Sequence, residues 1–221
     1  MGALIGALVA GKIADKIGRN KSLLLNDIVY AVGTLVCVIA PDFIVLVIGR
    51  FVVGLGVGLA SLLVPLFITE ISPKEIRGSI GVLNQLFITV GILAAFIVNF
   101  AFAKTPVNYN WRVMFGLAII PSVIHFVGAL VLKVESPKWL FVRGNLEGAS
   151  SMLRKLRGDH NVNSELDNLA LEENENNSSQ SSRLCVKKNA KPLVIGILMN
   201  FIQQAVGVNA IMFEFPSPSF L

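Results

Sequence analysis

Arg50 is the one charged side chain in a long apolar run, residues 43 to 69. A guanidinium cannot lose its proton to avoid burial, and a charge at the centre of a bilayer costs about 2.5–3.5 kcal/mol on insertion scales. The side chain can extend outward to the lipid headgroups. Alternatively, it can face the interior of a helical bundle, where a carboxylate on another helix pairs with it. We favour the second interpretation, in which Arg50 is an intramembrane charge with a functional role.

Uncharged amides are concentrated in two other apolar segments. Gln85 lies within residues 78–103, on the helical stripe that also carries Thr89. The segment 192–213 carries four amides: Asn200, Gln203, Gln204 and Asn209. A buried amide is costly without partners, so each should either bond a neighbouring helix or contact a polar ligand. Uncharged donors and acceptors beside apolar side chains suit the hydroxyl groups and C–H faces of a sugar.

Two of these amides can share a cavity only if their helix is interrupted. In an ideal helix Asn209 lies about 140° away from Gln204 around the axis. Gly207 lies between them and permits a local break. Because discontinuous helices line midplane sites in transporters, this segment is a candidate binding element.

The composition requires elements that cross a membrane. Only 15% of the residues are charged, and the mean hydropathy is +0.70, whereas soluble domains have about 25% charged residues. Apolar runs of 18 or more residues predict membrane helices. We therefore predict an all-α membrane protein with about six transmembrane helices, at residues 2–14, 22–40, 43–69, 78–103, 113–132 and 192–213. The first reaches roughly 20 Å, less than a 30 Å hydrocarbon core, so we expect it to be the end of a longer helix.

Basic residues alternate between the two sides of these predicted helices. Lysine and arginine are concentrated in the first, third and fifth connections and are sparse in the second and fourth. The positive-inside rule then places the loops in the cytoplasm, at residues 15–21, 70–77 and 133–190. This placement makes the lipid bilayer, and not nucleic acid, the partner of a chain with a net charge of +5.

The chain is predicted to have three parts. They are a partial N-terminal bundle (1–132), a cytoplasmic linker (133–190) and the first helix of a second bundle (191–221). In the linker, residues 147–158 carry Met152, Leu153 and Leu156 on one face, which is typical of a short amphipathic helix. The polar stretch 172–182 is predicted to be disordered.

The sequence has no pattern typical of an enzyme or a metalloprotein. It contains no nucleophile–base pair, phosphate-binding loop or cluster of metal ligands, so we expect no catalytic residue, metal or cofactor. Its two cysteines, Cys37 and Cys185, fall in a span and in the linker and should not form a disulfide. His125 lies inside a span, where packing through a hydrogen bond is commoner than proton transfer, and both roles remain open.

Six stretches resemble motifs of the sugar porter branch of the major facilitator superfamily. They are GKIADKIGRNK (11–21), GRFVVGLGVG (49–58), VPLFITEISPKEIRGSIG (64–81), NQLFITVGIL (84–93), ESPKWL (135–140) and QQAVGVNA (203–210). Six motifs in the family's order form a specific signal. The resemblance implies a partial major-facilitator bundle, in which this chain corresponds to helices 2 to 7 of twelve. We therefore expect the chain to be a fragment, and its last eight residues depart from the family pattern.

The resemblance also implies roles for particular residues. Gln85, Gln203, Gln204 and Asn209 match the amides that contact sugar in the family. Arg50 matches the arginine that faces an aspartate of helix 1 in proton-coupled members. This chain contains no counterpart of helix 1, so the resemblance leaves proton coupling open.

A third group of charges lies at the predicted cytoplasmic ends. Its members are Asp15, Arg19, Glu70, Arg77, Glu135 and Lys138. They are either solvated anchors that set the topology or a gate whose pairs lock these ends together. Partly wet ion pairs contribute only about 1 kcal/mol each, which suits a gate that must open. Lys138 stands where the family has arginine, and a lysine cannot make the same bidentate contact.

Transport of a hexose or similar sugar by alternating access, facilitative or proton-coupled, is the function that these features favour. The partners would be a small-molecule sugar, protons in a coupled mechanism and the lipid of the plasma membrane. The alternative is a non-transporting sugar sensor, or a truncated chain that associates with other transporter chains.

Overall fold

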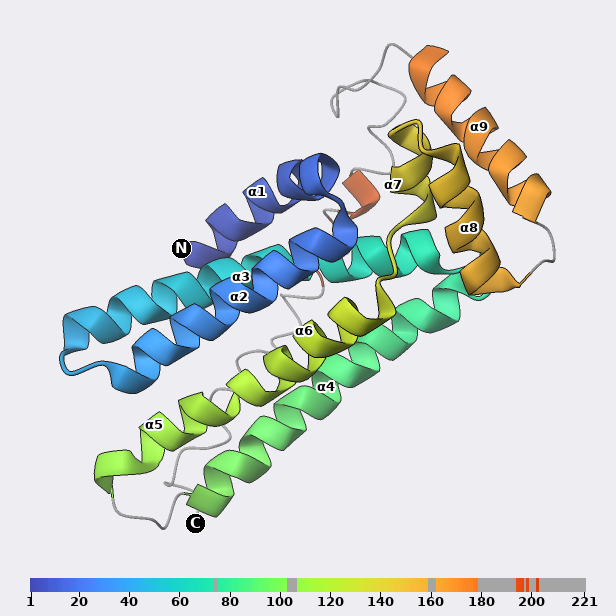
Figure 1. The fold of residues 1–221 in the computed structure, drawn as a ribbon. Coiled ribbons are helices and arrows are strands. Elements are labelled where there is room, and N and C mark those ends of the chain that lie inside the picture. The colour runs from blue at the N-terminus through green and yellow to red at the C-terminus, as the bar shows by residue number, and fades with distance from the viewer. Residues whose placement is uncertain are drawn as a thin grey trace. The chain divides into compact units, whose positions relative to one another are not determined.

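The computed structural model describes residues 1–73, 75–102, 107–158, 162–178, 194–196, 198 and 202. In these residues all regular secondary structure is helical (Figure 1). The named helices are α1 (Gly2–Ile17), α2 (Arg19–Ile39), α3 (Phe43–Ile71), α4 (Arg77–Phe102), α5 (Val107–Leu117), α6 (Ile119–Leu132), α7 (Pro137–Val142), α8 (Leu146–Arg157) and α9 (Val162–Ser178). The chain divides into two compact units, Met1–Leu166 and Asp167–Leu221. The contacts described below lie within the first unit.

Four stretches are long and apolar enough to cross a membrane. They are residues Arg19–Ile39, Phe43–Ile71, Arg77–Phe102 and Trp111–Leu132. These bounds agree with the four full-length spans predicted from hydropathy. The predicted span at 192–213 lies almost entirely outside the described residues.

The fourth span is interrupted where α5 gives way to α6. Pro121 has no backbone N–H, so it cannot donate to the carbonyl of Leu117 as a helical residue would. In the preceding turn, the N–H of Ala118 bonds the carbonyl oxygen of Phe115, three residues back, at 3.1 Å. This turn is tighter than that of an α-helix. The span is therefore continuous in hydropathy, but its α-helical hydrogen bonding is interrupted at Ala118.

Glycines allow α1 to lie directly against α3. A Cβ atom on Gly2 would collide with the carbonyl oxygen of Phe51, and one on Gly6 with that of Leu55. On the facing helix, a Cβ on Gly58 would collide with the carbonyl oxygen of Ala3. Small residues allow membrane helices to pack backbone to backbone in this way. In Figure 1, α1 accordingly runs alongside α3, and α2 lies beside both.

The connections between spans gather alternately at two ends of this unit. The first, third and fifth connections meet through Arg19, which bonds Glu70 with its side chain and Glu135 with its backbone. We call this the charged end. At the opposite end, Arg112 bonds the carbonyl oxygens of Val38 at 3.1 Å and Ala40 at 3.0 Å. The arrangement agrees with the alternation predicted from the distribution of basic residues.

Two short helices follow the last span at the charged end. Helix α7 begins after Ser136, whose Oγ accepts a hydrogen bond from the N–H of Trp139. Helix α8 begins after Asn145, whose Oδ1 accepts from the N–H of Gly148. Both are N-terminal caps that satisfy an otherwise unpaired N–H group. Leu153 of α8 is buried, as the predicted amphipathic pattern requires.

Helix α9 runs further than the composition indicates. It ends at Ser178, inside the polar stretch 172–182 that was predicted to be disordered. Residues 162–178 contain neither proline nor glycine, so nothing in the sequence terminates the helix earlier.

Candidate functional site

A nearly buried ion pair joins two helices at the charged end. The guanidinium of Arg19 donates from Nε to Glu70 Oε2 at 2.8 Å and from Nη2 to Glu70 Oε1 at 2.9 Å. The side chains of Arg19 and Glu70 are only 11% and 8% exposed. Asp15 lies 3.3 Å from the same guanidinium, but its side chain is 75% exposed. Because bidentate pairs fix orientation as well as charge, Arg19 ties the beginning of α2 to the end of α3.

Glu135 caps the beginning of α2. Its Oε1 accepts hydrogen bonds from the backbone N–H groups of Arg19 at 2.8 Å and Asn20 at 3.1 Å, and also from Ser136. A carboxylate at a helix N-terminus is stabilised by the unpaired N–H groups and by the helix dipole. Gly18 permits the approach, since its φ is 99° and a Cβ there would lie 2.6 Å from Glu135 Oε2.

Basic side chains of the α7–α8 region bond the C-terminal ends of three preceding helices. Arg157 donates to the carbonyl oxygen of Ile71, the last residue of α3, at 2.7 Å. Lys155 donates to the carbonyl oxygen of Leu132, the last residue of α6, at 2.6 Å. Arg143 donates to the carbonyl oxygens near the end of α1. Helix C-termini offer unpaired carbonyls and negative potential, so these cations link α7 and α8 to the spans.

Four of the six predicted gate residues thus lie together: Asp15, Arg19, Glu70 and Glu135. Arg77 begins α4 with an exposed side chain and makes no ion pair with a described residue. Lys138 lies in the first turn of α7. The sequence pointed to these charges but missed the three cations of the α7–α8 region. Their only signal in the sequence was the density of basic residues between 143 and 157.

Arg50 contacts an aromatic ring. Its Cζ lies 4.6 Å from the centroid of the Phe115 ring, a cation–π distance. Phe115 in turn meets Trp111 edge to face, with ring centroids 6.1 Å apart. No carboxylate among the described residues pairs with Arg50. Its side chain is exposed within the described part of the chain, so it remains open to a further partner.

The structure describes one of the four amides that are predicted to contact sugar. Gln85 lies in α4 with an exposed side chain, and its backbone carbonyl oxygen accepts a hydrogen bond from the hydroxyl of Thr89. Gln203, Gln204 and Asn209 lie outside the described residues. The meeting of the four amides therefore stays a prediction.

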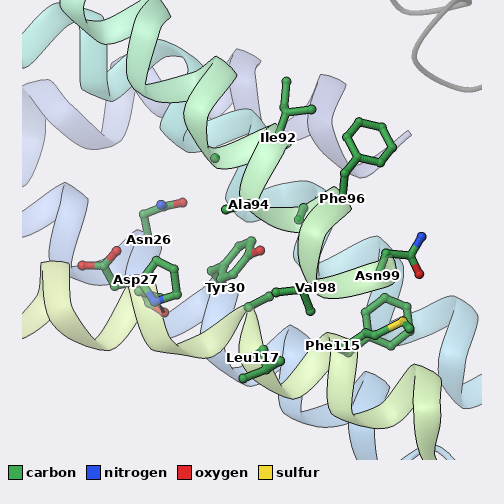
Figure 2. A pocket seen from close by; sticks show the side chains of 16 residues that line it. Asn26, Asp27, Tyr30, Ile92, Ala94, Phe96, Val98, Asn99, Phe115 and Leu117 are labelled. Atoms are coloured by element: carbon green, nitrogen blue, oxygen red, sulfur yellow. Dashed lines mark hydrogen bonds between the residues drawn. The ribbon is translucent and has the colours of Figure 1, made fainter. Parts of the chain in front are cut away.

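A cavity of about 760 Å³ lies among α2, α4, α5 and α6. This volume is in the range of small-molecule pockets. Its lining is largely apolar, with polar groups supplied by Asn26, Asp27, Tyr30, Asn99 and Ser122. Figure 2 shows Asn26, Asp27 and Tyr30 projecting from one helix, with Val98 and Asn99 on another. Gln85 is not part of this lining.

Asp27 is paired with His125 across two membrane helices. Its Oδ2 lies 2.7 Å from His125 Nδ1. The sequence drew attention to His125 alone, and Asp27 was missed although it is an acid inside an apolar span. No group of three or more potential metal ligands occurs in the described part of the chain.

These features define an integral, multi-pass membrane protein of helical-bundle architecture with paired charges at one end of its spans. The family model described as "Sugar (and other) transporter" matches residues 1–216. The chain belongs to this family, which comprises transporters and not enzymes. The resemblance seen in the sequence motifs is thereby confirmed.

Individual relatives agree with this assignment. The glucose transporter GlcP of Staphylococcus epidermidis is 39% identical over 216 residues, which are 96% of this chain and 47% of the relative. The plastidic glucose transporter 4 of Arabidopsis thaliana is 36% identical over 214 residues, 96% of this chain and 39% of the relative. The chain therefore spans about half the length, or less, of the curated relatives that it matches.

Solved structures confirm the fold. The major facilitator superfamily proton:xylose symporter XylE, bound to 6-bromo-6-deoxy-D-glucose, superimposes with a TM-score of 0.86 at 28% identity. The match covers 97% of this chain and 50% of XylE. An inward-open structure of XylE from E. coli gives a TM-score of 0.77. The predicted partial major-facilitator bundle is confirmed.

Proposed function

We propose that this chain forms part of a transporter that moves a hexose or a similar sugar by alternating access. The observation that carries the proposal is the bidentate pair between Arg19 and Glu70, in a chain of the sugar transporter family. Alternating access requires groups of helices that move as rigid bodies. The pair, with Glu135 on the first turn of α2, joins the ends of neighbouring helices into one such body.

The charged end is the proposed cytoplasmic gate. The concentration of lysine and arginine there supports a cytoplasmic location, and we propose the plasma membrane as the membrane. Arg77 and Lys138 would complete the gate by engaging charges that approach when the transporter closes. Since exposed ion pairs are individually weak, such contacts can separate during each transport cycle.

Gln85 is the proposed sugar contact within α4, and Gln203, Gln204 and Asn209 are the proposed contacts from the later segment. Arg50 is the proposed site of proton coupling. Its guanidinium rests on Phe115 and is free of any described carboxylate, so an acidic group could bind it and be released on protonation. The relative named as a proton:xylose symporter supports this role.

A chimera tests the transport proposal. Residues 1–216 of this chain would replace the matching segment of the S. epidermidis glucose transporter, and uptake of labelled glucose would be measured in cells without other glucose uptake. We expect uptake by the chimera. Gln85→Ala should lower it by roughly tenfold, which corresponds to the loss of one hydrogen bond of about 1.4 kcal/mol.

Asn84→Ala is the matched control, since the neighbouring amide lies about 100° away around the same helix. We expect that variant to retain most of the uptake. A chimera that reaches the membrane but takes up no glucose would contradict the transport proposal. Equal uptake by the Gln85→Ala variant and the unsubstituted chimera would contradict only the assignment of Gln85.

A further inference from the structure

Two titratable side chains face each other between α2 and α6. Asp27 and His125 are 98 residues apart in sequence, yet Oδ2 and Nδ1 are separated by 2.7 Å. The Asp27 side chain is only 10% exposed, whereas that of His125 is 48% exposed. At this distance the two atoms share a hydrogen bond, so at least one of them carries a proton.

A second contact holds the same two helices at the same residue. Ser122 Oγ donates to the backbone carbonyl oxygen of Asp27 at 3.2 Å. Ser122 and His125 are three residues apart, so they lie on one face of α6. Helix α6 therefore engages both the backbone and the side chain of Asp27, which fixes the geometry of the pair.

The charged side chains of the neighbouring helices make their described contacts with groups other than Asp27. On α3, Arg50 rests on Phe115 and Glu70 is bonded to Arg19. On α1, Asp15 meets Arg19 at the charged end. Neither of these two cations, Arg19 and Arg50, forms an ion pair with Asp27.

The cavity beside Asp27 supplies no counter-charge either. Arg112 of α5 bonds backbone carbonyls at the opposite end of α2. Tyr30 is the one other titratable side chain among the residues that line the cavity, and those contributed by α4, α5 and α6 are uncharged. A neutral phenol does not compensate an anion. Among the described residues, His125 is the group that pairs with the Asp27 carboxylate.

Water-borne protons have a route to the pair. Asp27 and Asn26 both line the cavity described above. Asn26 is only 7% exposed, and its Oδ1 has no hydrogen-bond donor among the described residues. A buried amide oxygen beside a roomy cavity with several polar groups in its lining is a place where water binds.

We propose that Asp27 and His125 form a proton-binding site between α2 and α6, in which one bound proton keeps the pair neutral. The proton arrives from water at the imidazole of His125, whose Nδ1–H donates to Asp27 Oδ2 in both states, and its release from the imidazolium returns it to water. The released state leaves one negative charge in apolar surroundings, which is costly. Release should therefore weaken the contact between α2 and α6. The site is separate from Arg50 and does not depend on the proposed transport function.

The test uses the full chain in lipid nanodiscs. The midpoint of thermal unfolding would be measured between about pH 5.5 and pH 9, the range that spans histidine titration. Because the proton-bound pair stabilises the contact, its contribution is present at low pH and is lost as pH rises. In the double variant Asp27→Asn/His125→Gln, two amides can keep a hydrogen bond but cannot titrate. We expect the midpoint of the unsubstituted chain to fall with pH, and that of the double variant to fall less.

His160→Gln removes the only other histidine and should leave the pH dependence unchanged. Proton NMR of the unsubstituted chain gives an independent measurement, because a proton held on a short N–O axis resonates far downfield. We expect one such signal, which moves upfield as pH rises and the imidazolium becomes neutral, and which is absent from the Asp27→Asn variant. Equal pH dependence of the unsubstituted chain and the double variant, or a chain without the downfield signal, would overturn the proposal.

Discussion

Arg19 is held by two carboxylates that differ sharply in exposure. Glu70 is almost buried and makes two hydrogen bonds to the guanidinium, whereas Asp15 is largely in solvent and makes one longer contact. Removing one partner of a buried pair leaves an uncompensated charge and costs about 3–5 kcal/mol. An exposed pair contributes about 0–1 kcal/mol. The two acids should therefore have unequal effects on stability.

We predict that Glu70→Gln lowers the free energy of unfolding by roughly 3 kcal/mol. Asp15→Asn should lower it by less than about 1 kcal/mol. Each substitution removes one negative charge and preserves side-chain size, so each is the matched control for the other. Chemical unfolding monitored by tryptophan fluorescence would measure both. Equal losses of stability would show that Glu70 is no more important to Arg19 than the solvent-exposed acid.

The sequence predicted which residue types matter at the charged end but not which atoms meet. Four of the six candidate gate charges do come together, and the cap formed by Glu135 on α2 spans 116 residues of sequence at 2.8 Å. No local pattern contains such a contact. Asp27 was missed for the same reason, because only the fold brings its partner His125 within hydrogen-bond distance.

At the scale of elements, α7 and α8 connect the spans to one another. Their basic side chains reach the last carbonyl groups of separate helices, with Arg157 on α3 and Lys155 on α6. Interactions between a cation and a helix C-terminus contribute about 0.3–1 kcal/mol each. The loss of one should loosen only the helix end that it bonds.

We predict that Arg157→Met speeds backbone hydrogen exchange in the last turn of α3, by roughly two- to fivefold. Lys155→Met should do the same in the last turn of α6 and leave α3 unchanged. Each variant controls for the other, because both lose a cation from the same helix. Exchange that rises equally at both ends in both variants would indicate a general loosening of α8.

Helices are the part of this structure that the sequence predicts best. Hydropathy placed the four described spans to within a few residues, because an apolar run of this length has no other stable form in lipid. The break between α5 and α6 was not predicted, although Pro121 provides a visible cause. The extension of α9 to Ser178 was missed because a polar composition indicates exposure to solvent but does not determine where a helix ends.

For the whole molecule, charge and hydropathy together predicted which connections share an end. The pairing of Arg19 with Glu70 and Glu135 at one end, and the bonds of Arg112 at the other, agree with that alternation. The division at residues 132 and 190 remains a prediction. So does the meeting of Gln85 with Gln203, Gln204 and Asn209, because helix packing around a site depends on contacts far apart in sequence.

We propose that Gln85 faces a water-filled path that sugar enters, while other faces of α4 meet lipid. The most direct measurement is labelling of Gln85→Cys by a membrane-impermeant thiol reagent in the chimera, with Cys37 and Cys185 replaced by serine. Phe87→Cys is the control, because position 87 lies about 200° away around the helix. We expect the reagent to label position 85, glucose to protect it, and position 87 to stay unlabelled. Failure to label position 85 in any transport state, or equal labelling of both positions, would show that Gln85 does not face such a path.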